Sequence, residues 1–413
     1  MTAPPPPTRL FARRDFRLYL CARGVVALAM QVQTVAVGWQ VYEITGDPLA
    51  LGYVGLALFL PAALCSLPAG DLADRFDRRR LAALAYALQA IGAGLLLALT
   101  LHGVSEPGPV YAVLVVGAIG RAVSGPAQQS YLPLLMPAAD LPRAVAATSA
   151  TFKIATIVGP AVGGILLVLG PAHAYAAGTV LFAVALATVL AIRTSGARPR
   201  ARDDVSPFRR LLVGIDYVWR QKIILGAISL DLFAVLLGGA AALLPIYARD
   251  ILAVGPQGLG VMRSAIAIGG AGMGLLLTWR PITRRVGAIM LGSVGVFGVA
   301  TVVFGVSTSF AVSLAALAVM GAADMVSVFV RQTAIQLATP DEMRGRVSSV
   351  NMLFIGASNE LGDFESGVTA AWFGVVPAVV LGGLGTIGIV ATWCGLFPAL
   401  RRMDRFADVM PKR

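Results

Sequence analysis

The stretch Gly70-Asp-Leu-Ala-Asp-Arg-Phe-Asp-Arg-Arg-Arg80 decides the fold, because it lies between two apolar segments that are each long enough to cross a bilayer. A membrane-spanning helix needs about 20 mainly apolar residues. A short charged run between two such helices must be a tight turn at the membrane surface. Short loops rich in Arg and Lys stay on the cytoplasmic side during insertion, so we expect this turn to face the cytoplasm.

The composition is that of a protein that crosses the membrane many times. Hydrophobic residues make up 57% of the chain, charged residues 13%, and the mean hydropathy is +0.80, whereas soluble proteins have about 25% charged residues. The net charge of +12 comes from Lys and Arg in alternate loops, with Arg249 beside Asp250 as the exception in an opposite loop. This distribution follows the positive-inside rule and excludes a nucleic-acid partner.

Apolar runs bounded by charge, Pro or Gly predict twelve spans. They are residues 18–42, 48–73, 80–101, 109–132, 141–169, 173–192, 223–248, 257–279, 286–306, 309–336, 346–371 and 376–399. The predicted organisation is a tail (1–17), a six-helix bundle (18–192), a linker (193–222), a second bundle (223–399) and a tail (400–413). Ser206 and Pro207 predict the start of an amphipathic helix that lies at the membrane surface.

The two halves repeat weakly when the sequence is shifted by 203 residues. The shift aligns Gln129 with Gln332 and Gly159 with Gly362. We therefore expect an all-α integral membrane fold of two pseudo-symmetric six-helix bundles, both of whose termini lie in the cytoplasm.

Several motifs resemble the major facilitator superfamily of secondary transporters. The charged turn at 70–80 is similar to the loop between helices 2 and 3 of that superfamily, although Asp77 stands where Gly is usual. The run Gly159-Pro160-Ala-Val-Gly163-Gly164 resembles the motif of its antiporters and exporters. The phrases Trp39–Gly52, Ala73–Arg80, Tyr131–Leu135 and Thr339–Val347 resemble the enterobactin (siderophore) exporter branch. The resemblance implies a proton-coupled exporter of an amphipathic small molecule, such as a siderophore or a drug, that works by alternating access in a bacterial inner membrane.

Charged residues inside the predicted spans are the candidates for coupling, because each costs about 2.5–3.5 kcal/mol to insert. The proton-coupling candidates are Arg121, Asp231, Asp324, Asp363 and Glu360. Arg121 resembles an arginine of the superfamily's fourth helix that is linked to proton coupling, and the repeat puts Asp324 at the equivalent depth of span 10. Our hypothesis is that these two residues pair in one state and separate in the other. Asp231 and Asp363 are rival proton carriers, and a static ion pair is the alternative for each acid.

Two further groups of residues have predicted roles in transport. The substrate-pathway candidates, which could equally join helices, are Gln31, Gln33, Gln128, Gln129, Lys153, Arg331 and Asn359. A conformational latch between the charged turn and span 11 would use Gly70, Asp74, Arg75, Arg78, Arg79, Arg344 and Arg346. The alternative is a solvated turn that sets topology only.

Other functional classes find little support in the sequence. An ATP-binding loop and a His-Glu-x-x-His metal site are both missing from the chain, whose two histidines are His102 and His173. We therefore expect no enzyme, no cofactor and no metal. The expected partners are a small-molecule substrate, protons and membrane lipid, and the expected state is a monomer. A lipid or lysolipid flippase on the same fold stays open as an alternative, and an intramembrane enzyme is the less favoured one.

Overall fold

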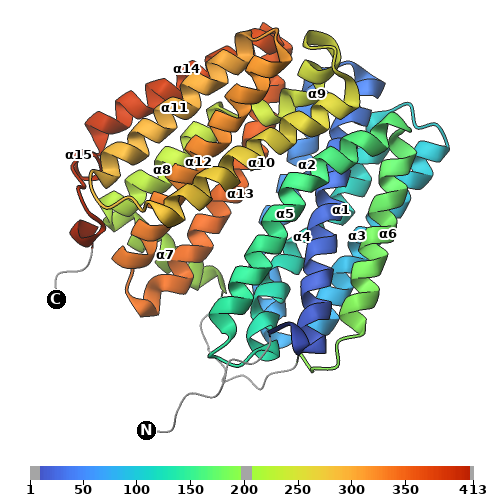
Figure 1. Cartoon of the computed structure of the whole chain (residues 1–413), viewed down its shortest axis with the longest axis horizontal. Helices are drawn as coiled ribbons and strands as arrows, with labels where there is room; N and C mark the ends of the chain where they lie inside the picture. The colour runs from blue at the N-terminus through green and yellow to red at the C-terminus, as the bar shows by residue number, and fades with distance from the viewer. Residues whose placement is uncertain (1–9, 197–206, 410–413) are drawn as a thin grey trace. The chain divides into compact units, whose positions relative to one another are not determined.

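The computed structural model describes residues 10–196 and 207–409, and this part of the chain is helical and contains no strand (Figure 1). Before the linker the elements are η1 (Leu10–Ala12), α1 (Arg14–Thr45), α2 (Pro48–Arg75), α3 (Arg78–Leu101), α4 (Pro107–Leu135), α5 (Leu141–Val168) and α6 (Pro171–Leu190). After it come α7 (Pro207–Arg220), α8 (Lys222–Leu237), η2 (Ala240–Leu243), α9 (Leu244–Ile246), η3 (Tyr247–Ile251), α10 (Gly255–Trp279), α11 (Val286–Val306), α12 (Phe310–Ala338), α13 (Asp341–Phe373), α14 (Val375–Leu396), α15 (Pro398–Arg401) and η4 (Phe406–Val409).

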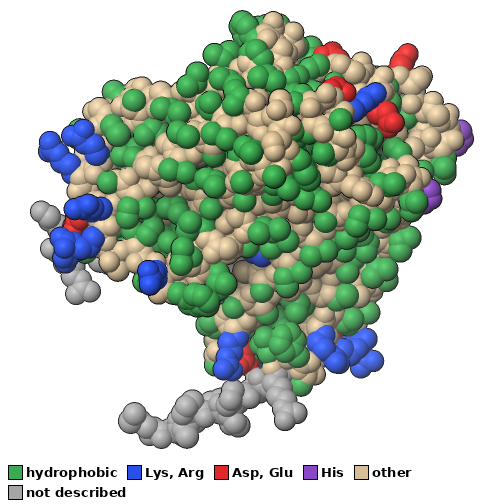
Figure 2. Space-filling view, turned by 45° about the horizontal axis from the view of Figure 1, so that its top comes forward, with side chains coloured by type: hydrophobic (Ala, Val, Ile, Leu, Met, Phe, Trp, Pro, Cys, Tyr) green, Lys and Arg blue, Asp and Glu red, His purple; other side chains and the backbone are tan. Residues whose placement is uncertain are grey.

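Eleven helices in the described residues are long and apolar enough to cross a membrane. The remaining predicted span, 346–371, falls inside α13, a 33-residue helix whose acidic and basic side chains lower its hydropathy. The all-helical membrane fold is thus confirmed. On the face that Figure 2 shows, Lys and Arg gather in a few groups, and the surface between them is largely hydrophobic.

The helices form two compact units. Unit 1 comprises Met1–Gln40 and Leu60–Asp204, and unit 2 comprises Val41–Phe59 and Val205–Arg413. The adjoining ends of α1 and α2, residues 41–59, therefore belong to unit 2 by their contacts. We call this segment the α1–α2 hairpin.

The packing inside each unit follows the repeat that the sequence predicts. In unit 1, α3 packs on α4 and α6; in unit 2 the equivalent helix α11 packs on α12 and α14. Gly159 of α5 lies against Gln31 of α1, and its repeat partner Gly362 of α13 lies against Val235 and Leu236 of α8. The same helix pairs thus meet at equivalent positions because small residues allow close approach of the backbones.

One predicted span is interrupted. The sequence predicted a single segment over 223–248, but α8 ends at Leu237, and short 3-10, α and π turns follow it. Gly238 and Gly239 lie at the break, where glycine weakens the helix. The hydroxyl of Ser366 on α13 donates to the freed carbonyl of Gly239 at 2.9 Å. A helix break is tolerated within a membrane when the freed backbone groups find hydrogen-bond partners of this kind.

The amphipathic helix of the linker is present as α7. It begins at Pro207, as predicted, whereas Ser206 lies outside the described residues. It packs on α8 and α13. Gly214 lies against the backbone of Arg346, and the hydroxyl of Tyr217 donates to the carbonyl of Ala338 at 2.9 Å. These contacts hold α7 against the ends of α12 and α13.

Candidate functional site

A buried ion pair joins α8 to α12 in unit 2. The Nη1 group of Arg331 donates to Oδ2 of Asp231, and the two residues are 2% and 5% exposed. Sequence reasoning assigned Asp231 to proton coupling and Arg331 to the substrate pathway as separate residues; the structure brings them together. Removing one member of such a pair costs about 3–5 kcal/mol, because the remaining charge is left buried.

A small pocket lies beside this pair. Its lining residues are Asp231, Ala234, Val235, Val294, Phe297, Ala323, Asp324 and Ser327, and it has room for about one water molecule. Asp324, Ser327 and Arg331 lie on one face of α12, since they are three, four and seven residues apart. A pocket of this size holds about one water molecule and is too small for a drug.

Two buried polar atoms, one beside the pair and one within it, have no hydrogen-bond partner in the described part of the chain. They are the hydroxyl oxygen of Ser327, a residue that is 2% exposed, and Nε of Arg331. Buried polar groups are normally paired, and exceptions cluster where a site takes water or changes partners. Ser327 therefore extends the candidate site beyond the residues that the sequence singled out.

Unit 1 has a different polar contact at the equivalent place. Gln128 takes the repeat position of Arg331, and its side-chain oxygen accepts from Nη1 of Arg23 at 2.9 Å. The hydroxyl of Tyr19 donates to the backbone oxygen of Gln128 at 2.9 Å. Sequence reasoning did not predict this contact; aligning Gln128 with Arg331 would have drawn attention to it.

A second group of charges lies on α13 and α10. We call Arg263 of α10 and Glu360 and Asp363 of α13 the α10–α13 charge cluster. Each of the three is half-buried, and Arg263 interacts electrostatically with Asp363. The Nη2 group of Arg263 also donates to the carbonyl of Ala241 at 3.4 Å. The α1–α2 hairpin lies against this cluster, because a Cβ atom added at Gly55 would be 2.8 Å from Cβ of Asp363.

The glycine motif of α5 forms a close contact with α1. A Cβ atom added at Gly159 would lie 2.5 Å from Cβ of Gln31, and one added at Gly163 would lie 3.1 Å from Cα of Val32. Gly159, Pro160, Gly163 and Gly164 are all buried. The motif therefore serves close helix packing, and its link to export stays a prediction.

The remaining pathway candidates differ in exposure. Gln129, Lys153 and Asn359 are exposed, whereas Gln31 and Gln33 are half-buried. Arg121 and Asp324 are also half-buried, on α4 of unit 1 and α12 of unit 2. Pairing of Arg121 with Asp324, and a role of the other side chains in the substrate pathway, stay predictions.

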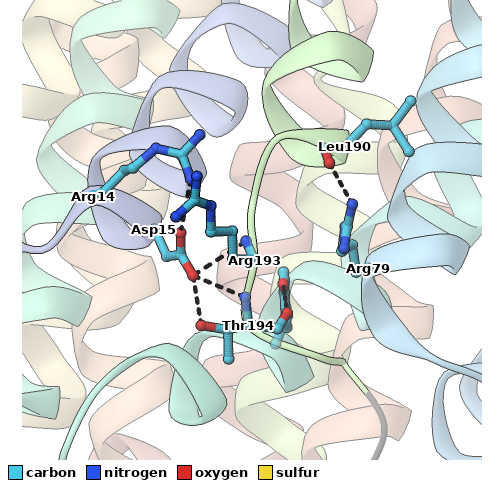
Figure 3. Close-up of polar contacts among 7 residues, drawn as sticks. Arg14, Asp15, Arg79, Leu190, Arg193 and Thr194 are labelled. Atoms are coloured by element: carbon cyan, nitrogen blue, oxygen red, sulfur yellow. Dashed lines mark hydrogen bonds and ion pairs between the residues drawn. The ribbon is translucent and has the colours of Figure 1, made fainter.

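Polar contacts tie the end of α6 to the starts of α1 and α3 (Figure 3). The carboxylate of Asp15 accepts from the backbone N–H groups of Arg193 and Thr194 at 3.2 and 2.8 Å, and from the hydroxyl of Thr194 at 2.6 Å. Arg79 donates to the carbonyl of Leu190. Arg78 is buried and donates through Nη1 to the carbonyl of Gly196 at 3.3 Å.

Two members of the predicted latch, Arg78 and Arg79, thus hold the chain where it leaves α6. Within α2 the backbone of Gly70, Asp74 and Arg75 is helical, but their side chains lie outside the described residues. Arg344 is exposed and Arg346 is half-buried on α13. The latch stays a prediction.

Comparison with known families decides the class of protein. The family model described as transmembrane secretion effector matches residues 7–412. The chain belongs to this family of major facilitator transporters. Three relatives are 26% identical to the chain. The alignment with the multidrug efflux pump Tap of Mycolicibacterium fortuitum covers 95% of this chain and 98% of the relative. For the macrolide efflux protein A of Streptococcus pyogenes the shares are 92% and 95%, and for the enterobactin exporter EntS of Escherichia coli they are 90% and 85%.

Solved structures agree on the fold of the chain. The nucleoside transporter NupG has a TM-score of 0.72 at 13% identity and covers 93% of this chain and 100% of its own. A bacterial homologue of ferroportin in an inward-facing state has a TM-score of 0.68 at 16% identity, with shares of 92% and 98%. The predicted twelve-helix transporter fold is therefore confirmed, and the chain is a multi-pass membrane transporter and not an enzyme.

Proposed function

We propose that the chain is an efflux pump that exports amphipathic small molecules and is driven by inward movement of protons. Similarity to relatives that carry the names of multidrug, macrolide and enterobactin exporters supports export of compounds of this size. The positive-inside distribution supports cytoplasmic termini, and the resemblance supports a bacterial inner membrane as the location. In this proposal the units alternate between inward-open and outward-open states.

The buried pair of Asp231 and Arg331 beside a water-sized pocket is the observation that carries the proposal. In its charged form Asp231 binds Arg331 and holds α8 against α12. A proton that enters through the pocket neutralises the carboxylate and releases the guanidinium, which then needs another anion. Asp324 lines the same pocket and is the second carboxylate within it. Exchange of Arg331 between two acids would couple proton movement to a shift of α12.

Substrate-driven proton flux tests this proposal. Proteoliposomes with a pH-sensitive dye inside would receive a macrolide, a cationic drug or a catecholate siderophore. We expect at least one compound to drive flux, and Asp231→Asn to abolish it. The matched control is Asp216→Asn, which removes an exposed surface carboxylate of α7 that pairs with Arg220 at 2.9 Å. Its flux should equal that of the parent protein.

The outcomes separate the alternatives. Transport without proton flux would contradict proton coupling, and unchanged flux in Asp231→Asn would contradict the assigned acid. Movement of a labelled lysolipid in the absence of any drug or siderophore flux would favour a flippase.

A stability measurement separates coupling from folding. We expect Arg331→Met to lower the free energy of unfolding by about 3–5 kcal/mol, and Asp231→Leu combined with Arg331→Met to recover most of that loss. Denaturation in detergent measures both. A double variant that folds well but shows no proton flux would identify the charges, and not the packing, as the source of coupling.

A further inference from the structure

One buried serine of α12 does not bond to its own helix. Elsewhere in unit 2 the hydroxyls of Ser293, Thr301 and Thr333 each donate to a backbone carbonyl three or four residues earlier in the same helix, at 2.8, 2.9 and 2.8 Å. Ser and Thr side chains inside helices commonly bond in this way. Ser327 is 2% exposed, yet its hydroxyl has no hydrogen-bond partner among the described residues. This hydroxyl is therefore available to another group.

Ser327 lines the water-sized pocket beside the buried ion pair. On one face of α12 it lies between Asp324 and Arg331, three residues after the first and four before the second. Side chains of a helix lean toward its N-terminus, so Arg331 leans toward Ser327, and Ser327 leans toward Asp324. Asp231 lines the pocket from the neighbouring helix α8. One hydroxyl and two carboxyl groups thus border a space for about one water molecule.

The polar groups around the pocket match the hydrogen bonds of a water molecule. A buried water makes about three hydrogen bonds and needs at least two polar partners. A serine hydroxyl donates or accepts, and a carboxylate accepts. The other side chains that line the pocket are apolar, so these three groups are its polar partners. Because an unpaired buried hydroxyl is costly, a bound water lowers the free energy of the site.

We propose that Ser327 positions one water molecule that carries a proton between Asp324 and Asp231. When Asp324 is protonated and Asp231 is charged, the water accepts the proton of Asp324 and passes one of its own protons to Asp231. The water is regenerated, Asp231 becomes neutral and Asp324 becomes charged. The role of the water as a relay rests on the proposed proton-driven export, whereas its binding beside Ser327 does not.

The relay keeps the charge of the site balanced. Before and after the step the pocket has one charged and one neutral carboxyl group, and the guanidinium of Arg331 has one anion to bind. A buried charge without a partner is strongly unfavourable. Transfer through a single water therefore lets Arg331 change acids without a state in which it lacks a counterion. Ser327 acts through the water and is a positioning residue.

Paired substitutions test the hydroxyl at constant side-chain shape, because Thr and Val differ mainly in the hydroxyl group. We expect Ser327→Thr to keep substrate-driven proton flux within about twofold of the parent protein, and Ser327→Val to lower it about tenfold, since the water loses a hydrogen bond. Ser327→Ala adds no atom to the site and should lower the flux to a similar extent. Equal flux in the parent protein, Ser327→Thr, Ser327→Val and Ser327→Ala would overturn the relay.

The matched control for these variants is Ser293→Ala. Ser293 is also buried in unit 2, but its hydroxyl bonds to the carbonyl of Met290 within α11. Its removal should leave the flux at the parent level.

Radiolytic footprinting tests the water itself. X-rays convert water into hydroxyl radicals, which oxidise the aromatic rings that they touch. The ring of Phe297 lines the pocket, whereas Phe304 of the same helix is 0% exposed and packs on Tyr247. We expect Phe297 to be oxidised in the parent protein and in Ser327→Thr, and several-fold less in Ser327→Val. Phe304 should stay unmodified in all three. Equal oxidation of Phe297 in Ser327→Thr and Ser327→Val would overturn the bound water.

The two measurements separate this inference from the proposed export. If no compound drives proton flux in the parent protein while oxidation of Phe297 depends on the hydroxyl, proton-driven export fails and the bound water stands. If the parent protein shows flux and both Ser327→Val and Ser327→Ala retain it, export stands and the relay fails.

Discussion

At the scale of single residues, the charges inside the spans could be named from the sequence, but their partners could not. Asp231 and Arg331 are 100 residues apart, and no local pattern connects them. The hydrogen bond of Arg23 to Gln128 was missed for the same reason. A charged residue within an apolar span stands out in the sequence as a functional candidate, because its insertion into the membrane is costly. Its partner depends on how the helices pack in three dimensions.

Asp404 offers a test of electrostatics outside the spans. Its side chain accepts from the backbone N–H of Arg285 at 3.0 Å, and this hydrogen bond, together with Arg284 and Arg405, lowers the pKa of the carboxyl group despite partial desolvation. Because the folded pKa is lower than the unfolded value of about 3.9, the contribution to stability is present above that pH and is lost as the pH falls through the folded pKa.

We therefore expect the amides of Arg285 and Val286 to lose protection from hydrogen exchange as the pH is lowered below about 4. In Asp404→Asn their protection should be low at every pH. Asp216→Asn, on the distant helix α7, should behave like the parent. Protection that does not change with pH in the parent protein would contradict this role of Asp404.

At the scale of elements, hydropathy predicted most helices closely. The span predicted over 286–306 coincides with α11, and the linker helix begins at Pro207 as expected. The break after Leu237 was missed because glycine is common in membrane helices and does not by itself mark a break. Its position follows from the hydrogen bond that Ser366 offers to Gly239, and this is again a contact between distant segments.

Gly159 shows how closely α5 and α1 must pack. We expect Gly159→Ala to lower the free energy of unfolding by about 1–3 kcal/mol, since the added methyl group would lie 2.5 Å from Cβ of Gln31. Gly125→Ala, in an open part of α4, should leave stability unchanged or raise it by up to about 1 kcal/mol through helix propensity. Denaturation in detergent compares the two. Equal effects of the two substitutions would contradict the close-packing role.

At the scale of the whole molecule, the weak repeat at 203 residues predicted two related bundles, and the structure adds which helices pack together: α3 on α4 and α6, and α11 on α12 and α14. The membrane orientation stays a prediction of the charge distribution. His102→Cys, after α3, should react with an impermeant maleimide outside intact cells, whereas Arg402→Cys, after α15, should react only in permeabilised cells. Both positions are exposed, so the protein itself does not shield either one. The reverse pattern would contradict cytoplasmic termini.

The two units carry different charged side chains inside the spans, and this difference has an electrical consequence. In the described middle of the spans, unit 1 carries the basic side chains Arg23, Arg121 and Lys153, whereas the acidic side chains belong to unit 2. A transmembrane voltage acts on each elementary charge with about 2.3 kcal/mol per 100 mV. In the proposed proton-driven cycle, the electrical force on unit 2 therefore changes each time one of its acids gains or loses a proton.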